Sequence, residues 1–428
     1  MRASAAGTRR RHSRSGLIAA LAGLLLLAAC AVNPVTGERQ FVLMTESQEI
    51  QMGRDADPEI VASMGLVEDE ELQAYVQELG SRMASRSERP DLPWTFRVLD
   101  DPLINAFALP GGFIYVTRGI LAHFESEAEL MGVLGHEIGH VTARHSVSQI
   151  SQQQLAAGVW GLGSVLVPEL QDYEALAGLG LQLAFLKFGR DDERQADRLG
   201  VRYMAQAGYD PAQLSGVMAM LGRVTSSGGG EGPPEWLSTH PNPENREETI
   251  LELAAVTPVT SEPPLVGRDD YLPRLDGMVF GENRREGFFE EGRFLHPDMA
   301  FQLDFPPGWR TANSKSAVEG LSPQEDALLV LTLTEGTSPA AALGSFLAQD
   351  GVSGGPPRER TLHGLSSAVA EFRHTTQNDT LQGRVTVVRH QGSLFRVLGV
   401  ASTEDWEDRR DAIRQTLDSF RPLTDSRV

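Results

Sequence analysis

The stretch Ser126–Ser146, SEAELMGVLGHEIGHVTARHS, decides the fold of the larger part of this 428-residue chain. Its apolar residues recur at intervals of three and four, which places them on one side of a helix. Ser126 followed by Glu129 forms the capping box with which such a helix begins. The pattern therefore predicts a buried helix whose apolar side consists of Leu130, Val133, Leu134, Ile138 and Val141.

This helix carries the pentapeptide His136-Glu137-Ile138-Gly139-His140. Helix positions four apart point in nearly the same direction, so the imidazoles of His136 and His140 can bind one cation. Glu137 stands beside them and can take a proton from a water molecule that the metal polarises. The spacing thus predicts a catalytic site with one zinc ion per chain, in which the two histidines are ligands and Glu137 is the base.

A chance match with two exposed histidines is the alternative, and the surroundings of the motif argue against it. The motif lies inside a well-capped apolar helix. Gly135 and Gly139 would each destabilise an ordinary helix by about 1 kcal/mol, and they make sense if another segment must pass close by. His145 would lie on the opposite side of an ideal helix from His136, so we do not expect it to be a ligand.

A catalytic zinc needs a third protein ligand, and the segment Phe188–Gly200, FGRDDERQADRLG, offers one. It reads as a second helix, on which Glu193 and Asp197 are four residues apart and share a face. One carboxylate can bind zinc while the other accepts the free ring N–H of a ligating histidine and fixes its tautomer. The neighbouring acids Asp191 and Asp192 are typical of a solvated helix start.

Together, the motifs at 136–140 and Glu193-x-x-x-Asp197 resemble the gluzincins of peptidase family forty-eight, which includes the CAAX prenyl endopeptidase and the bacterial HtpX protease. The resemblance implies a mainly α zincin (gluzincin) peptidase domain with a small β-sheet. It also implies that Glu193 is the third zinc ligand and that Asp197 orients a ligating histidine from behind.

The resemblance extends to two further segments. Ser238–Pro241 matches a segment whose histidine approaches the metal, which implies that His240 either restrains activity or steadies the oxyanion. Arg246, one turn into the following helix, can hold a carboxylate or the oxyanion; a capping-loop histidine and a surface arginine are the plain alternatives. The segment at 105–112 matches an edge strand that pairs with extended substrate, so substrate contacts are expected at Asn105, Ala106, Phe107 and Ala108.

The order of these segments is most similar to that of the periplasmic BepA and LoiP type members of the family, which lack membrane spans. The match covers residues 31–255. BepA-like proteins continue with a helical tetratricopeptide domain, whereas residues 290–428 of this chain show short alternating runs and a final helical pattern. This tail resembles the α/β/α sandwich of Mog-like and PsbP-like domains. A C-terminal α+β domain is therefore expected, and no shared partner or substrate is implied.

The first 29 residues have a basic start with five arginines, an apolar middle at Leu17–Leu27 and a small-residue end. This is the layout of a signal peptide, too short for a membrane-spanning helix. Leu27-Ala28-Ala29-Cys30 resembles the bacterial lipobox, which implies that Cys30 is acylated and becomes the first mature residue. The alternatives are an ordinary cleaved signal with an incidental cysteine and a twin-arginine signal. Ala31 rather than Asp after the cysteine favours the outer membrane.

Composition narrows the possible function classes. With 41% hydrophobic and 22% charged residues the chain is typical of globular proteins, and its length suggests two or three domains. Removing the five positive charges of residues 1–29 from the net charge of −20 leaves −25, which argues against nucleic-acid binding. Cys30 is the only cysteine, so an internal disulfide and a cysteine-bound metal are excluded.

Five consecutive regions are therefore expected. The apolar stretch 155–186 within the peptidase domain is core, lid or membrane-facing surface, and core packing is the plainest of the three. The regions are a signal peptide at 1–29, an unpacked lipid-anchored tether at 30–45, the zinc metallopeptidase domain at 46–260, a proline-containing linker at 261–289 and the C-terminal α+β domain at 290–428.

The expected function is that of a zinc-dependent metalloendopeptidase on the periplasmic side of the cell envelope, anchored through Cys30. Its substrates would be misfolded or stalled envelope proteins, its other partner is the membrane, and the oligomeric state stays open. One rival is a chaperone-like assembly factor for outer-membrane proteins with regulated or little proteolysis. A second rival makes the C-terminal domain a binding module carried by an anchored scaffold.

Overall fold

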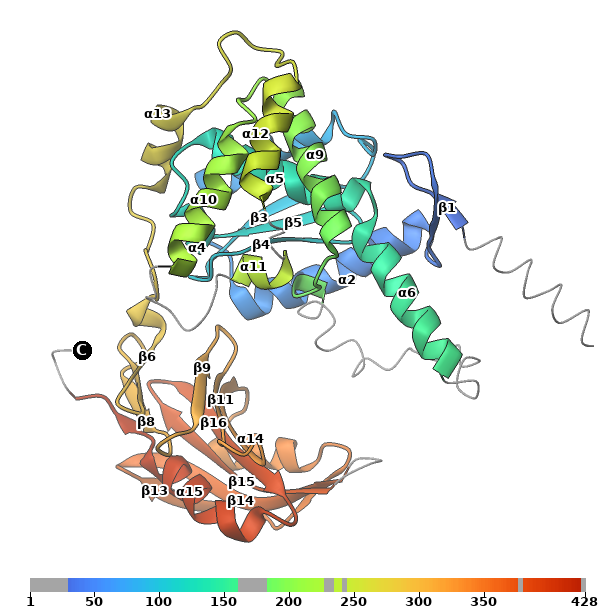
Figure 1. Cartoon of the computed structure of the whole chain (residues 1–428). Helices are drawn as coiled ribbons and strands as arrows, with labels where there is room; N and C mark the ends of the chain where they lie inside the picture. Colours follow the sequence, from blue (N-terminus) through green and yellow to red (C-terminus); the bar gives the residue numbers. More distant parts are fainter. Residues whose placement is uncertain (1–29, 161–182, 227–234, 241–244, 376–379, 425–428) are drawn as a thin grey trace, which may run out of the picture. The chain divides into compact units, whose positions relative to one another are not determined.

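The computed structural model describes residues 30–160, 183–226, 235–240, 245–375 and 380–424 (Figure 1). They divide into two compact units, the first reaching to Met278 and the second beginning at Val279. No helix within these ranges is long and apolar enough to cross a membrane. The expected signal peptide and most of the apolar stretch 155–186 lie outside the described residues.

The first unit starts with a short hairpin and two long helices. Strands β1 (Cys30–Val32) and β2 (Arg39–Phe41) pair antiparallel. Helices α2 (Glu46–Met64) and α3 (Glu70–Ala84) follow. The side chain of Asp69 accepts from the backbone N–H of Leu72 and so caps α3, which buries the apolar side made of Leu72, Tyr75, Val76, Leu79 and Met83.

The expectation that residues 30–45 form an unpacked tether is wrong for the segment around Asn33. This side chain is only 7% exposed, and its Nδ2 donates to the carbonyl of Ala143 at 3.2 Å. Its Oδ1 accepts from the backbone N–H groups of Val35 and Thr36. Because an asparagine that bonds its own following backbone closes a tight turn, Pro34 and Gly37 belong to a fixed hairpin rather than to a flexible linker.

A small mixed sheet lies beneath the helices. It contains β3 (Thr95–Leu99), β4 (Ala106–Leu109) and β5 (Phe113–Thr117) in the order β3-β5-β4, with β3 parallel and β4 antiparallel to β5. Gly111 and Gly112 both have positive φ in the β4–β5 turn. A side chain on Gly111 would come within 2.5 Å of the Ile50 Cα, so α2 can pack against this turn only because the residue is glycine.

The predicted central helix is α5 (Glu127–Thr142), which follows the short helix α4 (Arg118–Leu121). Ser126 caps it, as expected, by accepting from the backbone N–H of Glu129, and residues 128–142 are all buried. The helix ends four residues earlier than predicted, because Arg144 has φ of 60° and turns the chain. A separate helix, α6 (His145–Trp160), then leaves the body of the unit (Figure 1).

Helix α9 (Arg190–Gln206) crosses α5 at close range. A Cβ on Gly139 would lie 3.2 Å from the Ala196 Cα, and one on Gly135 would lie 3.2 Å from the Gly200 Cα. The expectation that another segment passes close to these glycines is therefore confirmed. The crossing brings the face of α9 that carries Glu193 to the two histidines.

The remaining helices that the structure describes in the first unit are α10 (Gln213–Ser226), α11 (Glu235–Thr239), α12 (Arg246–Val256), α13 (Arg268–Tyr271) and the 3-10 helix η1 (Leu272–Leu275). The expected linker 261–289 is wrong in its first half, because this chain packs on the first unit. Tyr271 is fully buried and its hydroxyl donates to the Leu121 carbonyl at 2.8 Å. The backbone N–H of Asp210 donates to the Leu265 carbonyl at 2.9 Å.

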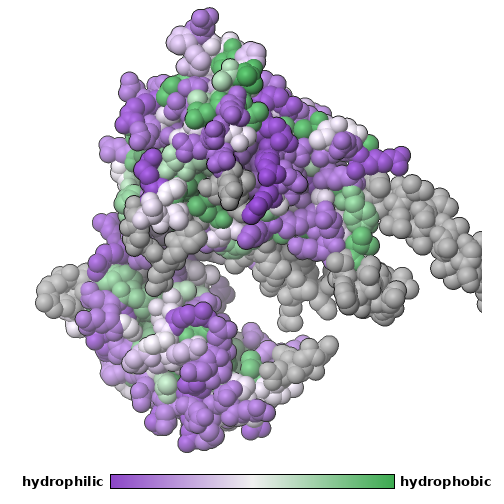
Figure 2. Space-filling model, in the orientation of Figure 1, coloured by the Kyte–Doolittle hydropathy of each residue, from purple (hydrophilic) through white to green (hydrophobic). Residues whose placement is uncertain are grey.

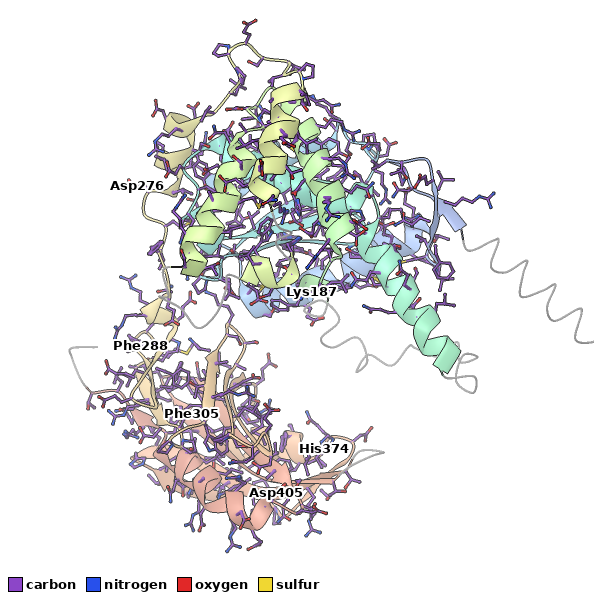
Figure 3. The ribbon with its side chains drawn as sticks, viewed as in Figure 1. Lys187, Asp276, Phe288, Phe305, His374 and Asp405 are labelled. Carbon is purple, nitrogen blue, oxygen red and sulfur yellow. The ribbon has the colours of Figure 1, made fainter. Side chains whose placement is uncertain are left out.

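Among its described residues, the second unit contains two antiparallel sheets and two α-helices, and Figure 3 marks Phe288 on its first strand. The smaller sheet, in the order β17-β8-β7-β6, contains β6 (Phe288–Glu290), β7 (Arg293–His296), β8 (Phe301–Asp304) and β17 (Arg421–Pro422). The larger sheet, in the order β12-β14-β15-β16-β11-β10-β9 with β13 on β14, contains β9 (Arg310–Asn313), β10 (Val318–Leu321), β11 (Ala327–Thr334), β12 (Val352–Gly354), β13 (Arg358–Leu362), β14 (Leu365–Thr375), β15 (Thr380–His390) and β16 (Ser393–Ser402). A 3-10 helix, η2 (Arg284–Glu286), precedes β6.

One helix covers each face of the larger sheet. Val387 shares a core cluster with Leu343 of α14 (Pro339–Leu347), whereas its neighbour Val388 shares one with Ile413 of α15 (Trp406–Ser419). Successive residues of a strand point to opposite faces, so α14 and α15 lie on opposite sides. The predicted fold class, a mainly helical peptidase domain plus an α/β/α-like domain, is confirmed. Figure 2 shows hydrophilic residues over most of the visible surface, in keeping with the net charge of −20.

Candidate metal centre

Four predicted side chains meet at one buried point in the first unit. They are His136 and His140 from α5, Glu193 from α9 and His240, which directly follows α11. Each is fully buried, and one ligand atom from each lies within 4.8 Å of the others. Segments that are about fifty residues apart along the chain thus converge on a single group of nitrogen and oxygen donors.

The spacing of these atoms fits a tetrahedral metal. The two histidine Nε2 atoms are 3.0 Å apart. The Glu193 Oε1 atom lies 3.4 Å from His140 Nε2, and its Oε2 atom lies 3.5 Å from His136 Nε2. Ligands at about 2.0–2.1 Å around a tetrahedral zinc are separated by about 3.3 Å. The two nitrogens and the carboxylate therefore have the donor chemistry and the spacing of a zinc site.

The tautomer of His136 follows from its partner. Its Nδ1 lies 3.0 Å from Asp197 Oδ1, and a carboxylate only accepts, so Nδ1 carries the proton and Nε2 faces the cluster. Asp197 is in turn held by Arg246, whose Nε and Nη2 both donate to it at 2.7 Å. Burial alone would lower the pKa of His136, but hydrogen bonds to Asp197 and Glu193 raise it to about 9, so a cation would have to displace the proton of Nε2 in order to bind there.

His145, which sequence analysis set aside, supports the second histidine. Its Nε2 lies 3.0 Å from the Gln195 Oε1, an acceptor, so Nε2 carries the proton and Nδ1 is free to accept. That Nδ1 lies 3.0 Å from His140 Nδ1, which then donates and leaves His140 Nε2 to face the cluster. The side chain of Asp192, expected to be merely solvated, lies 3.6 Å from His145. His145 is outside the ligand group, as expected, but directly behind it.

Glu137 lies beside the cluster with one oxygen unbound. Its Oε1 accepts from the indole Nε1 of Trp236 at 3.5 Å and lies 3.6 Å from His240 Nε2. Its Oε2 has no hydrogen-bond partner among the described residues. Burial raises the pKa of this carboxyl group. A buried carboxylate with a free oxygen and a raised pKa has the properties of a general base.

His240 and Arg246 both lie at the centre, and the surface alternative for Arg246 is wrong because this side chain is buried. His240 Nδ1 lies 2.9 Å from Glu193 Oε1, and its ring stacks on Trp236 with a centroid separation of 5.0 Å. Arg246 is 3% exposed, and its Nη1 lies 3.0 Å from Glu193 Oε2. Burial would raise the pKa of Glu193, but the three histidines outweigh it and lower that pKa well below its usual value.

The predicted substrate strand is an edge of the small sheet. β4 pairs with β5 on one side, and no other described strand pairs with its second side. Ala106, Phe107 and Ala108 are buried, and the backbone N–H of Trp236 donates to the carbonyl of Ile104 just before the strand. The amide atoms of the buried Asn105 side chain have no hydrogen-bond partner among the described residues. The strand thus lies next to α11, which flanks the metal centre.

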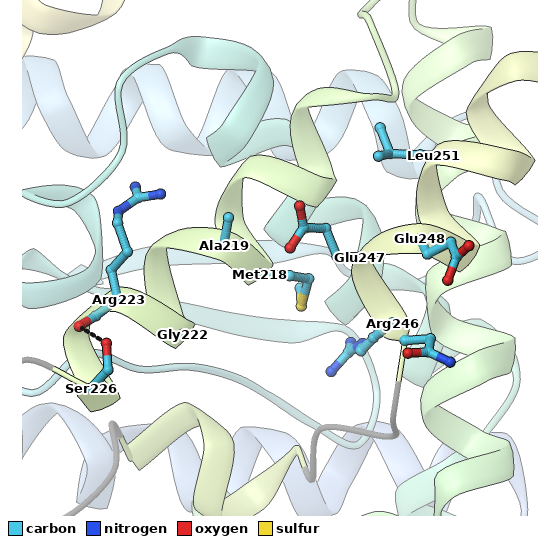
Figure 4. Close-up of a pocket in the computed structure, with 10 residues that line it drawn as sticks. Met218, Ala219, Gly222, Arg223, Ser226, Arg246, Glu247, Glu248 and Leu251 are labelled. Atoms are coloured by element: carbon cyan, nitrogen blue, oxygen red, sulfur yellow. Dashed lines mark hydrogen bonds between the residues drawn. The ribbon is translucent and has the colours of Figure 1, made fainter.

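An open groove lies between α10 and α12 (Figure 4). Its cavity volume is about 680 Å³. Met218 and Leu251 give it apolar walls, Glu247 and Arg223 give it charges, and Arg246 connects it to the metal centre. This groove leaves no pattern in the sequence, because its two helices come together only in the tertiary structure.

Comparison with known proteins identifies relatives of the first unit. The family described as Peptidase family M48 matches residues 70–254. The beta-barrel assembly-enhancing protease of Yersinia pestis is 32% identical over 232 residues, which cover 52% of this chain and 47% of that protein. The mitochondrial metalloendopeptidase OMA1 of Schizosaccharomyces pombe is 30% identical over 244 residues, which cover 55% of this chain and 70% of that protein. The chain thus spans less than half of the first of these relatives.

The chain also has likenesses among solved structures. The cyanobacterial PsbP (CyanoP) of Synechocystis aligns with a TM-score of 0.26 and 14% sequence identity, over 34% of this chain and 98% of that one.

Proposed function

The chain belongs to peptidase family M48, and from this premise we propose that it is a zinc-dependent metalloendopeptidase of the cell envelope. The observation that carries the proposal is the buried convergence of His136, His140 and Glu193, with Glu137 and its free oxygen beside them. The three side chains would hold one zinc ion. A purely structural metal site would have no need of a neighbouring base.

Zinc in this donor set supplies a Lewis acid that polarises a peptide carbonyl and lowers the pKa of water to about 7. Glu137 accepts the proton of the attacking water on Oε2 and then donates it to the leaving amine nitrogen. Arg246 holds Asp197 and Glu193 in place by charge-assisted contacts. Extended substrate would add to the β4 edge near Asn105 and Ala108.

The proposed location rests on the N-terminal sequence, and the proposed substrates rest on that location and on a relative. A signal peptide and a lipobox-like segment support export and acylation at Cys30, with Ala31 favouring the outer membrane and the periplasmic side. Substrates are misfolded or stalled envelope proteins, so the enzyme serves protein quality control. The name of the Yersinia relative, an assembly-enhancing protease, supports a task of this kind.

One observation favours a second candidate, an assembly factor for outer-membrane proteins with regulated or little proteolysis. His240 Nδ1 lies 3.3 Å from His136 Nε2 and 2.9 Å from Glu193 Oε1, within the ligand group. A fourth protein ligand closes a zinc site, whereas a catalytic site keeps one position for water. The chain would then cut only when a substrate or partner draws His240 aside.

The test compares the full chain with three variants for bound zinc and for cleavage of casein. We expect one zinc per chain throughout and a loss of about 10²- to 10⁴-fold in rate for Glu137→Gln, because a general base contributes that much. Asp191→Asn, on the exposed start of α9, controls for loss of a carboxylate. Zinc without cleavage by the unmodified chain, but with cleavage by His240→Ala, would favour the second candidate; no zinc at all would contradict both.

A further inference from the structure

The segment between Cys30 and α2 is held by three hydrogen bonds to the end of α5, the turn after it and helix α6. Asn33 Nδ2 donates to the Ala143 carbonyl. Arg144 Nη2 donates to the Met44 carbonyl at 3.0 Å, and the backbone N–H of Leu43 donates to Ser151 Oγ at 3.0 Å on α6. Glu49, 1% exposed, pairs with Arg144 as well. The segment between Cys30 and α2 therefore cannot move away from α5 without breaking buried polar contacts.

Because of these contacts, almost no unattached chain lies between Cys30 and the folded unit. Asn33 is three residues further on, and three residues span at most about 11 Å. The backbone of Cys30 is itself paired with Phe41. Ala143, to which Asn33 is bonded, follows His140 by three residues, which is about 4.5 Å along a helix axis. The route from Cys30 through Asn33 and Ala143 to His140 is therefore short.

We propose that the first unit is seated directly on the lipid bilayer and that its metal centre works within about 20 Å of the lipid surface. The inference rests on the proposed acylation of Cys30. It assigns the natural substrate class: backbone segments that lie at the membrane surface, such as loops of membrane-embedded proteins, whereas a soluble chain such as casein is cut when it diffuses to that surface.

Exposed apolar residues lie along the path that leads from Cys30 to α6. Val32, Leu43 and Leu155 are 61%, 49% and 42% exposed, respectively. Leu155 is one turn after Ser151 on α6 and so shares the side of the helix to which Leu43 is bonded. In Figure 1, β1 and the far end of α6 both lie at the right-hand margin of the unit. Exposed apolar residues around an acyl anchor add to membrane affinity by entering the interfacial region.

The first test measures how far from the lipid surface the anchored enzyme can cut. The acylated full chain is reconstituted in vesicles of phosphatidylethanolamine and phosphatidylglycerol that carry lipid-linked reporter peptides. Polyproline spacers of 5 or 15 residues hold the cleavable bond about 15 or about 45 Å from the surface. We expect cleavage of the near reporter only. An insert of 30 Gly and Ser residues between Cys30 and Ala31 adds a reach of about 30 Å, so this variant should cut both.

A matched control carries the same insert at the Glu291–Gly292 turn of the second unit and should still cut only the near reporter. Equal cleavage of both reporters by the unmodified chain would overturn the inference. Casein cleavage reports the peptidase separately, and the mass of the N-terminal peptide reports acylation. A peptide without acyl chains would refute the anchor and this inference together, while casein cleavage would still support the peptidase.

The second test measures whether position 155 enters the lipid bilayer. Cys30 is the only cysteine, so Leu155→Cys provides the one free thiol of the acylated chain. A bimane label at this position should be quenched by brominated lipid. The same label at Leu251→Cys, on α12 and 44% exposed, should not be quenched. An unquenched label at position 155 would contradict the seating even if the reach test agreed with it.

Discussion

His136 and His140 lie on the same helix, yet a different kind of side chain orients each of them. A carboxylate, Asp197, stands behind His136, and a neutral imidazole, His145, stands behind His140. In both cases the rear nitrogen donates, so the front nitrogen offers a lone pair to the cluster. Such partners fix the orientation of a metal ligand and raise its basicity. The structure therefore gives His145 a positioning role that its place in the sequence conceals.

Replacing His145 should weaken metal binding more than it weakens the fold. His145→Phe fills the space but accepts no hydrogen bond, and we expect about 10- to 100-fold lower zinc affinity in competition with a chelator. His145→Asn, whose Oδ1 can accept from His140 Nδ1, should restore most of that affinity. A residue that served packing alone would give the opposite order, with the larger phenylalanine closer to the unmodified protein.

At the scale of elements, the crossing of α5 and α9 decides whether Glu193 reaches the histidines. Gly139 and Ala196 meet at this crossing with no room for a side chain between the helices. Helices usually pack 8–10 Å apart depending on the side chains at the contact, so small residues allow the closer approach.

Gly139→Leu should push α9 away from α5. We expect destabilisation of about 1–3 kcal/mol, typical of overpacking, together with loss of zinc binding. Thermal unfolding and zinc content measure the two effects. Gly222→Leu on α10 introduces the same side chain where nothing lies within 4 Å; it should leave zinc binding unchanged and raise the stability, because a glycine inside a helix costs about 1 kcal/mol. Unchanged zinc binding in the Gly139 variant would show that the crossing does not set the site.

The small sheet of the second unit is tied to the end of the chain by Asp304. Arg421 Nη1 donates to it at 2.8 Å, and Arg293 Nε donates at 3.0 Å. Burial would raise the pKa of Asp304, but Arg421 outweighs it and lowers that pKa below the ordinary value of 3.8. The folded state then binds fewer protons than the unfolded state, so this carboxylate stabilises the unit above pH 3.8.

That stabilisation should vanish as the pH falls through the lowered pKa of Asp304. Asp304→Asn should have a lower melting temperature than the unmodified chain at pH 7, and the difference should close below pH 3.8. Asp350→Asn, at an exposed site, should show no difference at either pH. A difference between the Asp304 variant and the parent that persists at low pH would refute the assignment.

At the scale of the whole molecule, the boundary between the units determines which part can work alone. The sequence places the end of the peptidase domain at 260, whereas the structure carries the first unit to Met278. The additional chain brings Tyr271 into the main hydrophobic cluster. Removing a large buried aromatic side chain costs about 3–5 kcal/mol.

A chain of residues 31–278 should fold, bind zinc and cut casein, whereas one of residues 31–260 should melt at a clearly lower temperature. Differential scanning calorimetry and the casein assay distinguish the two. If residues 31–278 fold and bind zinc but do not cut, the second unit takes part in the reaction. This result would support the rival reading in which the C-terminal domain carries the function.

The sequence by itself determined whatever depends on local pattern. The histidine spacing, the Ser126 cap and the glycines of α5 are statements about one helix, and the alternating runs of β11, β14, β15 and β16 are statements about single strands. Periodicities of 3.6 and 2 are properties of the local backbone, so they can be read without knowing what lies opposite. Residues 136, 140 and 193 were predicted as ligands in this way and by family resemblance, and the structure brings their side chains together.

Tertiary structure alone decided what lies behind and around those residues. Arg144 turns the chain at φ of 60°, which ends α5 early and swings His145 back to His140. Asn33 finds its acceptor 110 residues away at Ala143, and Tyr271 finds its acceptor 150 residues away at Leu121. Such contacts depend on how elements pack, and a side chain that can bond equally well to water or to a distant carbonyl leaves no periodic trace in the sequence.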